Sequence, residues 1–165
     1  MIETLSRLFG KWAKSITMLS PVAGRVIPLS EVKDSTFADG LLGEGVAVEP
    51  SGERVVSPSK ARVEAIFPTG YAVALRTEDG LDILIHVGLN TIELNGRHFK
   101  VHATEGDIVE RGQVLIEYDR TAVEAEGFDT TVPILLCNSV EFSSMKGCLG
   151  ELVDELDPLF TVRER

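Results

Sequence analysis

The chain has 165 residues, 44% of them hydrophobic and 25% charged, which is the size and composition of one soluble globular domain. It contains no run approaching the roughly 18 consecutive apolar residues of a membrane-spanning helix. Its formal net charge of −10 repels a phosphate backbone, so we expect no nucleic-acid partner.

The first 18 residues differ from the rest of the chain in charge and in periodicity. Arg7, Lys11 and Lys14 outnumber the single acid Glu3. Apolar residues recur at helical spacing, namely Ile2, Leu5, Leu8, Phe9, Trp12 and Ile16. We therefore predict an amphipathic helix or a flexible tail over residues 1–18, ahead of a domain over residues 19–165. The apolar stripe either packs on the domain or gives residues 1–17 a weak contact with an anionic membrane.

From Met18 onward, short runs rich in Val, Ile and Leu alternate with clusters of Gly, Pro and Asp. This pattern is typical of many short strands joined by tight turns. We predict an all-β fold with strands at residues 24–28, 46–50, 54–56, 61–67, 71–77, 82–87, 100–102, 114–118, 131–137 and 159–162.

Two segments of this region resemble each other. Residues 20–26 read Ser-Pro-Val-Ala-Gly-Arg-Val, and residues 57–63 read Ser-Pro-Ser-Lys-Ala-Arg-Val. Each proline suits the start of a strand, where no hydrogen bond of the sheet is lost. The pattern suggests two related halves of one sandwich, with a chance similarity of two turn-and-strand units as the alternative.

One of the three histidines, His86, has a sequence context that suggests chemistry, since histidine changes charge near neutral pH. Residues 80–91 read Gly-Leu-Asp-Ile-Leu-Ile-His-Val-Gly-Leu-Asn-Thr. Period-two alternation puts Ile83, Ile85 and Val87 on one face of a strand and Asp82, Leu84 and His86 on the other. If the first set faces the core, His86 is an accessible imidazole beside Gly88, which leaves room for an approaching group.

The preceding strand predicts a neighbour for this histidine. Asp79-Gly80 is a strong signal for a two-residue hairpin turn, which would pair Val73 with His86. Tyr71 would then be a diagonal neighbour about 7–8 Å away on the same face, within reach of an aromatic side chain. A register shifted by one residue would move Tyr71 to the opposite face.

The run from Gly80 to Thr91 resembles the phosphorylation-site signature of the glucose-type enzyme IIA family of the bacterial phosphoenolpyruvate-dependent sugar phosphotransferase system. Flanking segments are similar to the family in the same order, over nearly the whole chain after residue 19. These segments are Ser20-Pro21 with Gly24, the stretch from Asp34 through Phe37-Ala38 to residues 43–48, Leu94-Asn95-Gly96 with Phe99, and Glu105-Gly106-Asp107 with Gly112.

The resemblance implies a phosphotransferase component with a phosphohistidine intermediate at His86. The imidazole would accept a phosphoryl group from phospho-HPr and pass it to a cysteine of a sugar-specific enzyme IIB/IIC permease. We expect no metal and no other cofactor, because a neutral imidazole nitrogen is itself the nucleophile. Its other nitrogen is expected to donate a hydrogen bond that fixes the tautomer. The family's fold is an antiparallel β-sandwich, or barrel-sandwich hybrid, with short helical turns.

The resemblance also assigns the surroundings of His86. Thr69 and Gly88 belong to the site, and Tyr71 stands where the family has a second histidine. A phenol donates one hydrogen bond but carries no positive charge, so onward transfer is expected to be slower. Partner contacts are expected from Asp34, Phe37, Leu41, Leu42, Phe67, Leu84 and Asn90.

Two questions stay open at this point. The alternative function is a regulatory phosphoreceiver whose onward transfer is impaired by Tyr71. The location is expected to be cytoplasmic, because no secretory signal is recognisable at the start, and peripheral at the inner face of the membrane if the first residues bind lipid.

Overall fold

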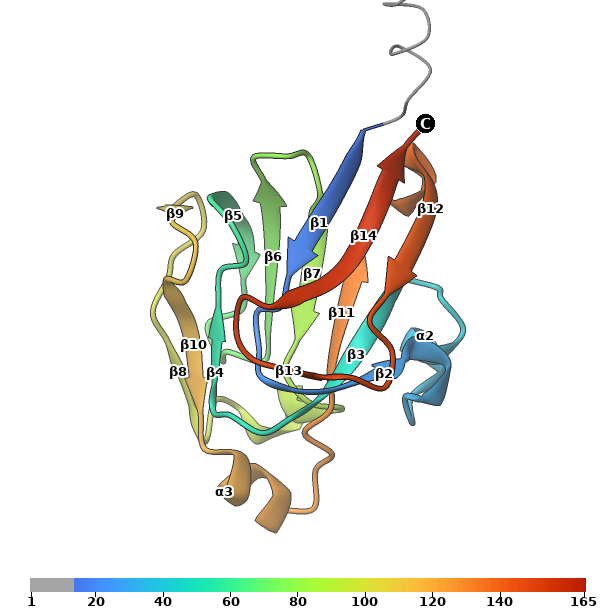
Figure 1. Ribbon diagram of the computed structural model, residues 1–165. Helices are drawn as coiled ribbons and strands as arrows, with labels where there is room; N and C mark the ends of the chain where they lie inside the picture. Colours follow the sequence, from blue (N-terminus) through green and yellow to red (C-terminus); the bar gives the residue numbers. More distant parts are fainter. Residues whose placement is uncertain (1–13) are drawn as a thin grey trace, which may run out of the picture.

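The computed structural model describes residues 14–165, which form three antiparallel sheets joined by short turns and helices (Figure 1). The large sheet contains, in spatial order, β13 (Leu152–Val153), β2 (Gly24–Pro28), β3 (Glu44–Pro50), β11 (Val132–Leu136), β7 (Asp82–His86), β6 (Ala72–Thr77), β5 (Ala61–Ile66) and β9 (Ile108–Val109). The predicted all-β sandwich is confirmed.

Two small sheets complete the body. One contains β1 (Ser15–Leu19), β14 (Pro158–Glu164) and β12 (Phe142–Gly147), and the other contains β4 (Arg54–Val56), β10 (Val114–Tyr118) and β8 (Phe99–Val101). The helices are short: α2 (Ser35–Ala38), α3 (Arg120–Ala125) and the 3-10 turns Leu29–Glu31, Thr91–Leu94 and Ser139–Glu141. None of the helices within residues 14–165 is long and apolar enough to cross a membrane.

The core lies between one face of the large sheet and the two small sheets. A single buried cluster joins Ile85 and Ile134 of the large sheet to Phe160 of β14 and Ile116 of β10. Strand β7 alternates buried and half-buried residues, so one of its faces is turned to this core, whereas β11 is buried along its whole length. The opposite face of the large sheet is therefore left available for a site at β7.

All ten predicted strands are present, with ends within two residues of those predicted. Strands β9 and β13 were not predicted, because two residues are too few for a periodic pattern. Strand β12 was not predicted either, because its sequence, Phe-Ser-Ser-Met-Lys-Gly, lacks an apolar alternation and lies at the edge of its sheet.

The helix predicted over residues 1–18 is wrong for its last residues. Ser15–Leu19 is strand β1, in which Ile16 pairs with Val162 of β14. Ile16 and Met18 are buried while Thr17 is exposed, so the period there is two, and pairing with β14 overrides the helical pattern. The rest of the predicted helix, residues 1–13, lies outside the described residues.

The internal repeat is confirmed by matching hydrogen bonds in its two copies. The Ser20 hydroxyl donates to the Val22 carbonyl at 2.6 Å, and the Ser57 hydroxyl donates to the Ser59 carbonyl at 2.7 Å. Both serines are fully buried, so each hydroxyl needs such a partner. The same turn therefore opens β2 in one half and β5 in the other.

The two halves of the large sheet are also similar in the order of their strands. Strand β13 flanks β2 in the first half as β9 flanks β5 in the second. Strands β11 and β7 meet at the centre, where Ile134 pairs with Ile85. The sheet thus consists of two similar four-stranded halves, and positions in one half have equivalents in the other.

Candidate functional site

His86 is the last residue of β7 and lies on the outer face of the large sheet. Ile83, Ile85 and Val87 are buried in the core, as predicted. His86 and Leu84 face the other way and are half-buried. The predicted orientation of this strand is confirmed.

The equivalent position in the other half explains why His86 is accessible. Leu135 pairs with Gly45 of β3 as His86 pairs with Ala72 of β6. Residues 29–43, which connect β2 to β3, include α2 and bury Leu135 completely. The connection between β5 and β6 spans only residues 67–71 and leaves His86 half-exposed. The longer connection therefore makes Leu135 a core residue, and the shorter connection leaves the equivalent residue, His86, available as a candidate site.

A hydrogen bond to the backbone fixes the tautomer of His86. Nδ1 lies 2.7 Å from the carbonyl oxygen of Gly88. A carbonyl only accepts, so Nδ1 carries the proton and donates, and Nε2 keeps its lone pair. The expected donation by the second nitrogen is confirmed, whereas the use of the Gly88 carbonyl was not foreseen from the sequence.

Gly88 is in the left-handed region of backbone conformation, with φ of 81°. A Cβ atom added there would lie 2.5 Å from Cγ2 of Thr91 and 3.0 Å from the carbonyl oxygen of Asp129. Both the conformation and the space therefore require glycine. A glycine two residues after a histidine was the sequence signal available for this role.

The surroundings of His86 favour its neutral form. Burial lowers the pKa of His86, while the bond to Gly88 and the negative charge of Asp34 partly oppose this shift. Asp34 caps the first turn of α2, where its side chain accepts a hydrogen bond from the Thr36 amide at 3.0 Å. The imidazole is consequently available as a nucleophile at neutral pH.

Aromatic rings hold the imidazole on two sides. The Phe37 ring is tilted against it, with centroids 5.0 Å apart, and the Tyr71 ring meets it edge-on at 5.4 Å. Phe67 in turn stacks on Tyr71 at 4.7 Å. These contacts combine a buried ring from α2 with two rings from the turn before β6, and they restrict the orientation of His86.

The predicted register of the hairpin is wrong by one residue. Ala72, not Val73, pairs with His86, because the turn contains three residues, 78–80, with Gly80 in the left-handed region. Tyr71 nevertheless contacts His86, since it precedes β6 and does not follow the alternation of the strand. The predicted neighbour is therefore correct for a different reason.

The other predicted site residues differ in their burial and in whether they contact His86. Leu84 packs against the buried cluster that contains Phe37 and Leu135. Leu41, Leu42 and Phe67 are 74%, 42% and 41% exposed. Asn90 is exposed with a left-handed φ of 59°, a conformation that Asn tolerates well. Thr69 is half-buried in the turn that carries Tyr71. The described contacts of His86 do not include Thr69, Leu41, Leu42 or Asn90.

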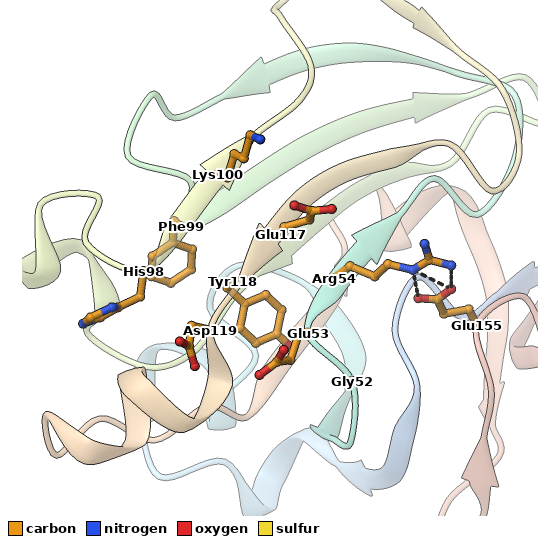
Figure 2. A pocket seen from close by; sticks show the side chains of 10 residues that line it. All are labelled: Gly52, Glu53, Arg54, His98, Phe99, Lys100, Glu117, Tyr118, Asp119 and Glu155. Atoms are coloured by element: carbon orange, nitrogen blue, oxygen red, sulfur yellow. Dashed lines mark hydrogen bonds and ion pairs between the residues drawn. The ribbon is translucent and has the colours of Figure 1, made fainter.

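A cavity of about 590 Å³ lies elsewhere, at the sheet β4-β10-β8 (Figure 2). It is lined by Gly52, Glu53, Arg54, His98, Phe99, Lys100, Glu117, Tyr118, Asp119 and Glu155. Of the lining residues, Arg54 pairs with Glu155 at 2.8 Å, and His98 pairs with Glu126. His86 and Tyr71 are not among its lining residues. Within residues 14–165, no group of three His, Cys, Asp or Glu side chains is placed to hold a metal ion.

The sequence matches the family model described as the phosphoenolpyruvate-dependent sugar phosphotransferase system, EIIA 1, over residues 16–142. The chain belongs to this family. As a member of this family, the EIIA chain has a phosphotransfer role in the sugar phosphotransferase system. Its all-β sandwich is the fold that was predicted from the resemblance to this family.

This EIIA chain is similar to a relative of about its own length and to a much longer relative. The "PTS system glucose-specific EIIA component" of Oceanobacillus iheyensis is 36% identical over 146 residues, which cover 88% of each protein. The "PTS system beta-glucoside-specific EIIBCA component" of Dickeya chrysanthemi is 40% identical over 143 residues. That match covers 87% of this chain and only 23% of the longer relative.

A solved structure has the same fold. The glucose permease IIA from Mycoplasma capricolum superimposes with a TM-score of 0.80 at 28% identity, covering 90% of this chain and 96% of that protein. The sandwich and its connections are therefore those of an EIIA domain.

Proposed function

We propose that this EIIA protein is a phosphocarrier that accepts a phosphoryl group on Nε2 of His86 from phospho-HPr and passes it to a cysteine of a sugar-specific enzyme IIB. The observation that carries the proposal is the 2.7 Å bond from Nδ1 to the Gly88 carbonyl, which leaves Nε2 as the nucleophilic atom. The half-exposed position of His86 on the outer face of the sheet supports access by another protein.

The acceptance step needs no proton transfer within this chain. The Nε2 lone pair attacks phosphorus, a new N–P bond forms, and the bond from phosphorus to the donor imidazole breaks. Nδ1 keeps its hydrogen, and the positive charge that the ring gains is stabilised by the Gly88 carbonyl. The lowering of the His86 pKa by burial supports this step, because it favours the neutral form of the ring.

We assign the partner surface to the residues around His86. Leu41, Leu42 and Phe67 supply exposed apolar side chains, and Asp34 and Asn90 supply polar ones. An apolar centre with a polar rim is the usual composition of a transient protein interface. Phe37 and Leu84 support this surface from below, and we include Thr69 and Gly88 in the site.

The enzyme IIB/IIC partner and the location are part of the same proposal. Several relatives are named EIIBCA components, which supports acceptance of the phosphoryl group by a IIB domain of a sugar permease. We place the protein in the cytoplasm, with weak membrane contact through the part of residues 1–17 that precedes β1. The regulatory phosphoreceiver considered above is not favoured by the relatives, whose names describe transport-system components.

The test is phosphorylation of His86→Gln with labelled phosphoenolpyruvate and the two upstream phosphotransferase proteins. We expect the substitution to abolish labelling, because the amide has no nucleophilic nitrogen. His98→Gln and His102→Gln are matched controls and should label normally, since these histidines are engaged with Glu126 and Glu117. Undiminished labelling of His86→Gln would overturn the assignment.

A further inference from the structure

The turn after the 3-10 segment Thr91–Leu94 contains a chemically labile pair, Asn95-Gly96. Asparagine is one of the heat-labile residues of proteins, because the backbone nitrogen of the next residue can attack its side-chain carbonyl and close a five-membered ring. Glycine in the next position leaves this nitrogen unshielded, since it has no Cβ. Three pairs in the chain have Asn or Asp before Gly and are candidates for ring closure: Asp39-Gly40, Asp79-Gly80 and Asn95-Gly96.

Hydrogen bonding separates Asn95-Gly96 from the other two pairs. The amides of Gly40 and Gly80 each donate to a backbone carbonyl, at 3.1 Å and 3.0 Å. Within residues 14–165, no hydrogen bond uses the Gly96 amide or the Asn95 carbonyl. The peptide unit between Asn95 and Gly96 can therefore rotate without breaking a hydrogen bond, and its nitrogen is available.

The conformation of the pair allows this rotation. Asn95 and Gly96 both have left-handed backbones, with φ of 52° and 89°. Ring closure requires rotation about the Asn95 Cα–C bond away from its ψ of 37°, and glycine tolerates the resulting change because it adopts positive and negative φ about equally. Asn95 is exposed, and its side-chain amide donates only a weak, 3.4 Å bond to the Glu93 carbonyl. Both reacting groups are thus free to meet.

The chain's two other asparagines are held more firmly. The Asn90 carbonyl accepts from the Glu93 amide at 3.1 Å, which ties down the peptide unit that would have to rotate. The Asn138 side chain accepts from one backbone amide and donates to one backbone carbonyl, both at 2.9 Å. Neither residue precedes a glycine. Asn90 and Asn138 are therefore internal controls for Asn95.

We propose that Asn95 is a site of spontaneous deamidation, which converts it to isoaspartate or aspartate and thereby alters the turn beside the His86 site. The co-reactant is water. The chemistry goes beyond the proposed function, and only its effect on phosphate acceptance rests on that function.

The atoms of the reaction balance with water as the co-reactant. The Gly96 nitrogen loses its proton to hydroxide and attacks Cγ of Asn95, a C–N bond forms, and the bond from Cγ to the side-chain nitrogen breaks. That nitrogen leaves as ammonia after taking a proton from water, and a cyclic imide remains. Water then opens either C–N bond of the imide, giving aspartate or isoaspartate. Nothing is oxidised or reduced, and the product adds one negative charge to a formal net charge of −10.

The modified turn lies next to the turn that holds Tyr71. A Cβ atom added at Gly96 would lie 3.7 Å from Cα of Thr69, which is ordinary van der Waals contact. Phe67 stacks on Tyr71 in this second turn, and Tyr71 meets the His86 imidazole edge-on. Isoaspartate lengthens the main chain by one carbon at this contact, and packed structure does not absorb such a change without shifting. We therefore expect phosphate acceptance to slow.

The experiment incubates the full-length protein at about pH 7, 8 and 9 and samples it over time. Mass spectrometry of its peptides locates the gain of about 1 Da that marks conversion of an amide to an acid, and isoaspartyl methyltransferase with a labelled methyl donor counts isoaspartate. We expect both signals in the peptide that contains Asn95, at a rate that rises about 10-fold per pH unit because the attacking nitrogen must first lose a proton. The peptides with Asn90 and Asn138 should be modified at least about 10-fold more slowly.

Asn95→Gln is the matched variant. It keeps the amide, but ring closure would need a six-membered ring, so we expect the signal at this position to fall at least about 10-fold. Aged wild-type protein is then separated by charge, and phosphorylation by phospho-HPr is compared for the modified and unmodified fractions. We expect the modified fraction to accept phosphate at least about 3-fold more slowly, whereas Asn95→Gln aged in parallel keeps its initial rate.

Failure of this inference is distinguishable from failure of the proposed function. Absence of the mass gain at Asn95, or equally fast modification of Asn90 or Asn138, would overturn the inference. Equal acceptance by the modified and unmodified fractions would overturn its effect on the site. Absence of label from fresh, unmodified protein would instead contradict the role of His86, and a mass gain at Asn95 would then still support the deamidation.

Discussion

Gly88→Ala tests the backbone arrangement that prepares His86. The substitution places a Cβ atom 2.5 Å from Cγ2 of Thr91 and 3.0 Å from the Asp129 carbonyl, at a φ of 81°. The left-handed conformation costs a non-glycine residue about 1–2 kcal/mol, and the close contacts add about 1–3 kcal/mol. We expect a loss of about 2–5 kcal/mol in the free energy of unfolding and slower phosphorylation of His86, because relief of the contacts moves the carbonyl that holds Nδ1.

Gly127→Ala is the matched control for this change. Gly127 has a φ of 91°, yet no atom lies within 4 Å of the added Cβ, so only the conformational part of the effect remains. Urea denaturation should therefore show about 1–3 kcal/mol less destabilisation in the control, and labelling of His86 should be normal. Equal destabilisation of the two variants, or unchanged labelling of Gly88→Ala, would refute the argument.

Two further predictions concern His86 and the first residues. Because burial lowers the folded-state pKa of His86, the unfolded chain binds more protons below about pH 6.5, and stability should fall as the pH decreases through that value. Urea titrations at pH 5 and pH 8 should show a smaller fall for His86→Gln, and an equal fall in both proteins would contradict the shift. Deletion of residues 1–13 should abolish weak binding to anionic vesicles while leaving β1 intact. Vesicle sedimentation measures this, and equal binding by the shortened chain would exclude a membrane role for the segment.

Most of the fold could be predicted from the sequence, because apolar alternation and turn residues determine strands and turns locally. Ile83, Ile85 and Val87 face the core as their spacing predicts, and Gly80 lies in the tight turn that joins β6 to β7. The length of that turn was not predictable from Asp79-Gly80 alone, since two- and three-residue turns share this pair. Strand β1 was missed because its pairing with β14 joins distant ends of the chain.

The candidate site was only partly predictable, because two of its contacts depend on tertiary structure. The identity of His86 and its neighbour Tyr71 came from sequence, yet the geometry that unites them is the turn before β6. The packing of Phe37 on the imidazole requires α2 to fold over the sheet, and no local pattern specifies that docking. The contact of the Gly88 carbonyl with His86 could not be predicted, because every residue has a backbone carbonyl and no sequence pattern marks this one.

The two similar halves of the large sheet lead to a last prediction about why one of them holds a site. Leu135 occupies in the first half the position that His86 occupies in the second, but residues 29–43 bury it. We expect His86→Gln/Leu135→His to remain unlabelled by phospho-HPr and to be about 2–5 kcal/mol less stable than His86→Gln, because a polar ring replaces a fully buried leucine. Labelling assays and urea denaturation of the two proteins measure this. If the histidine at position 135 accepted phosphate, strand position would determine the site, and loop length and the Gly88 carbonyl would not.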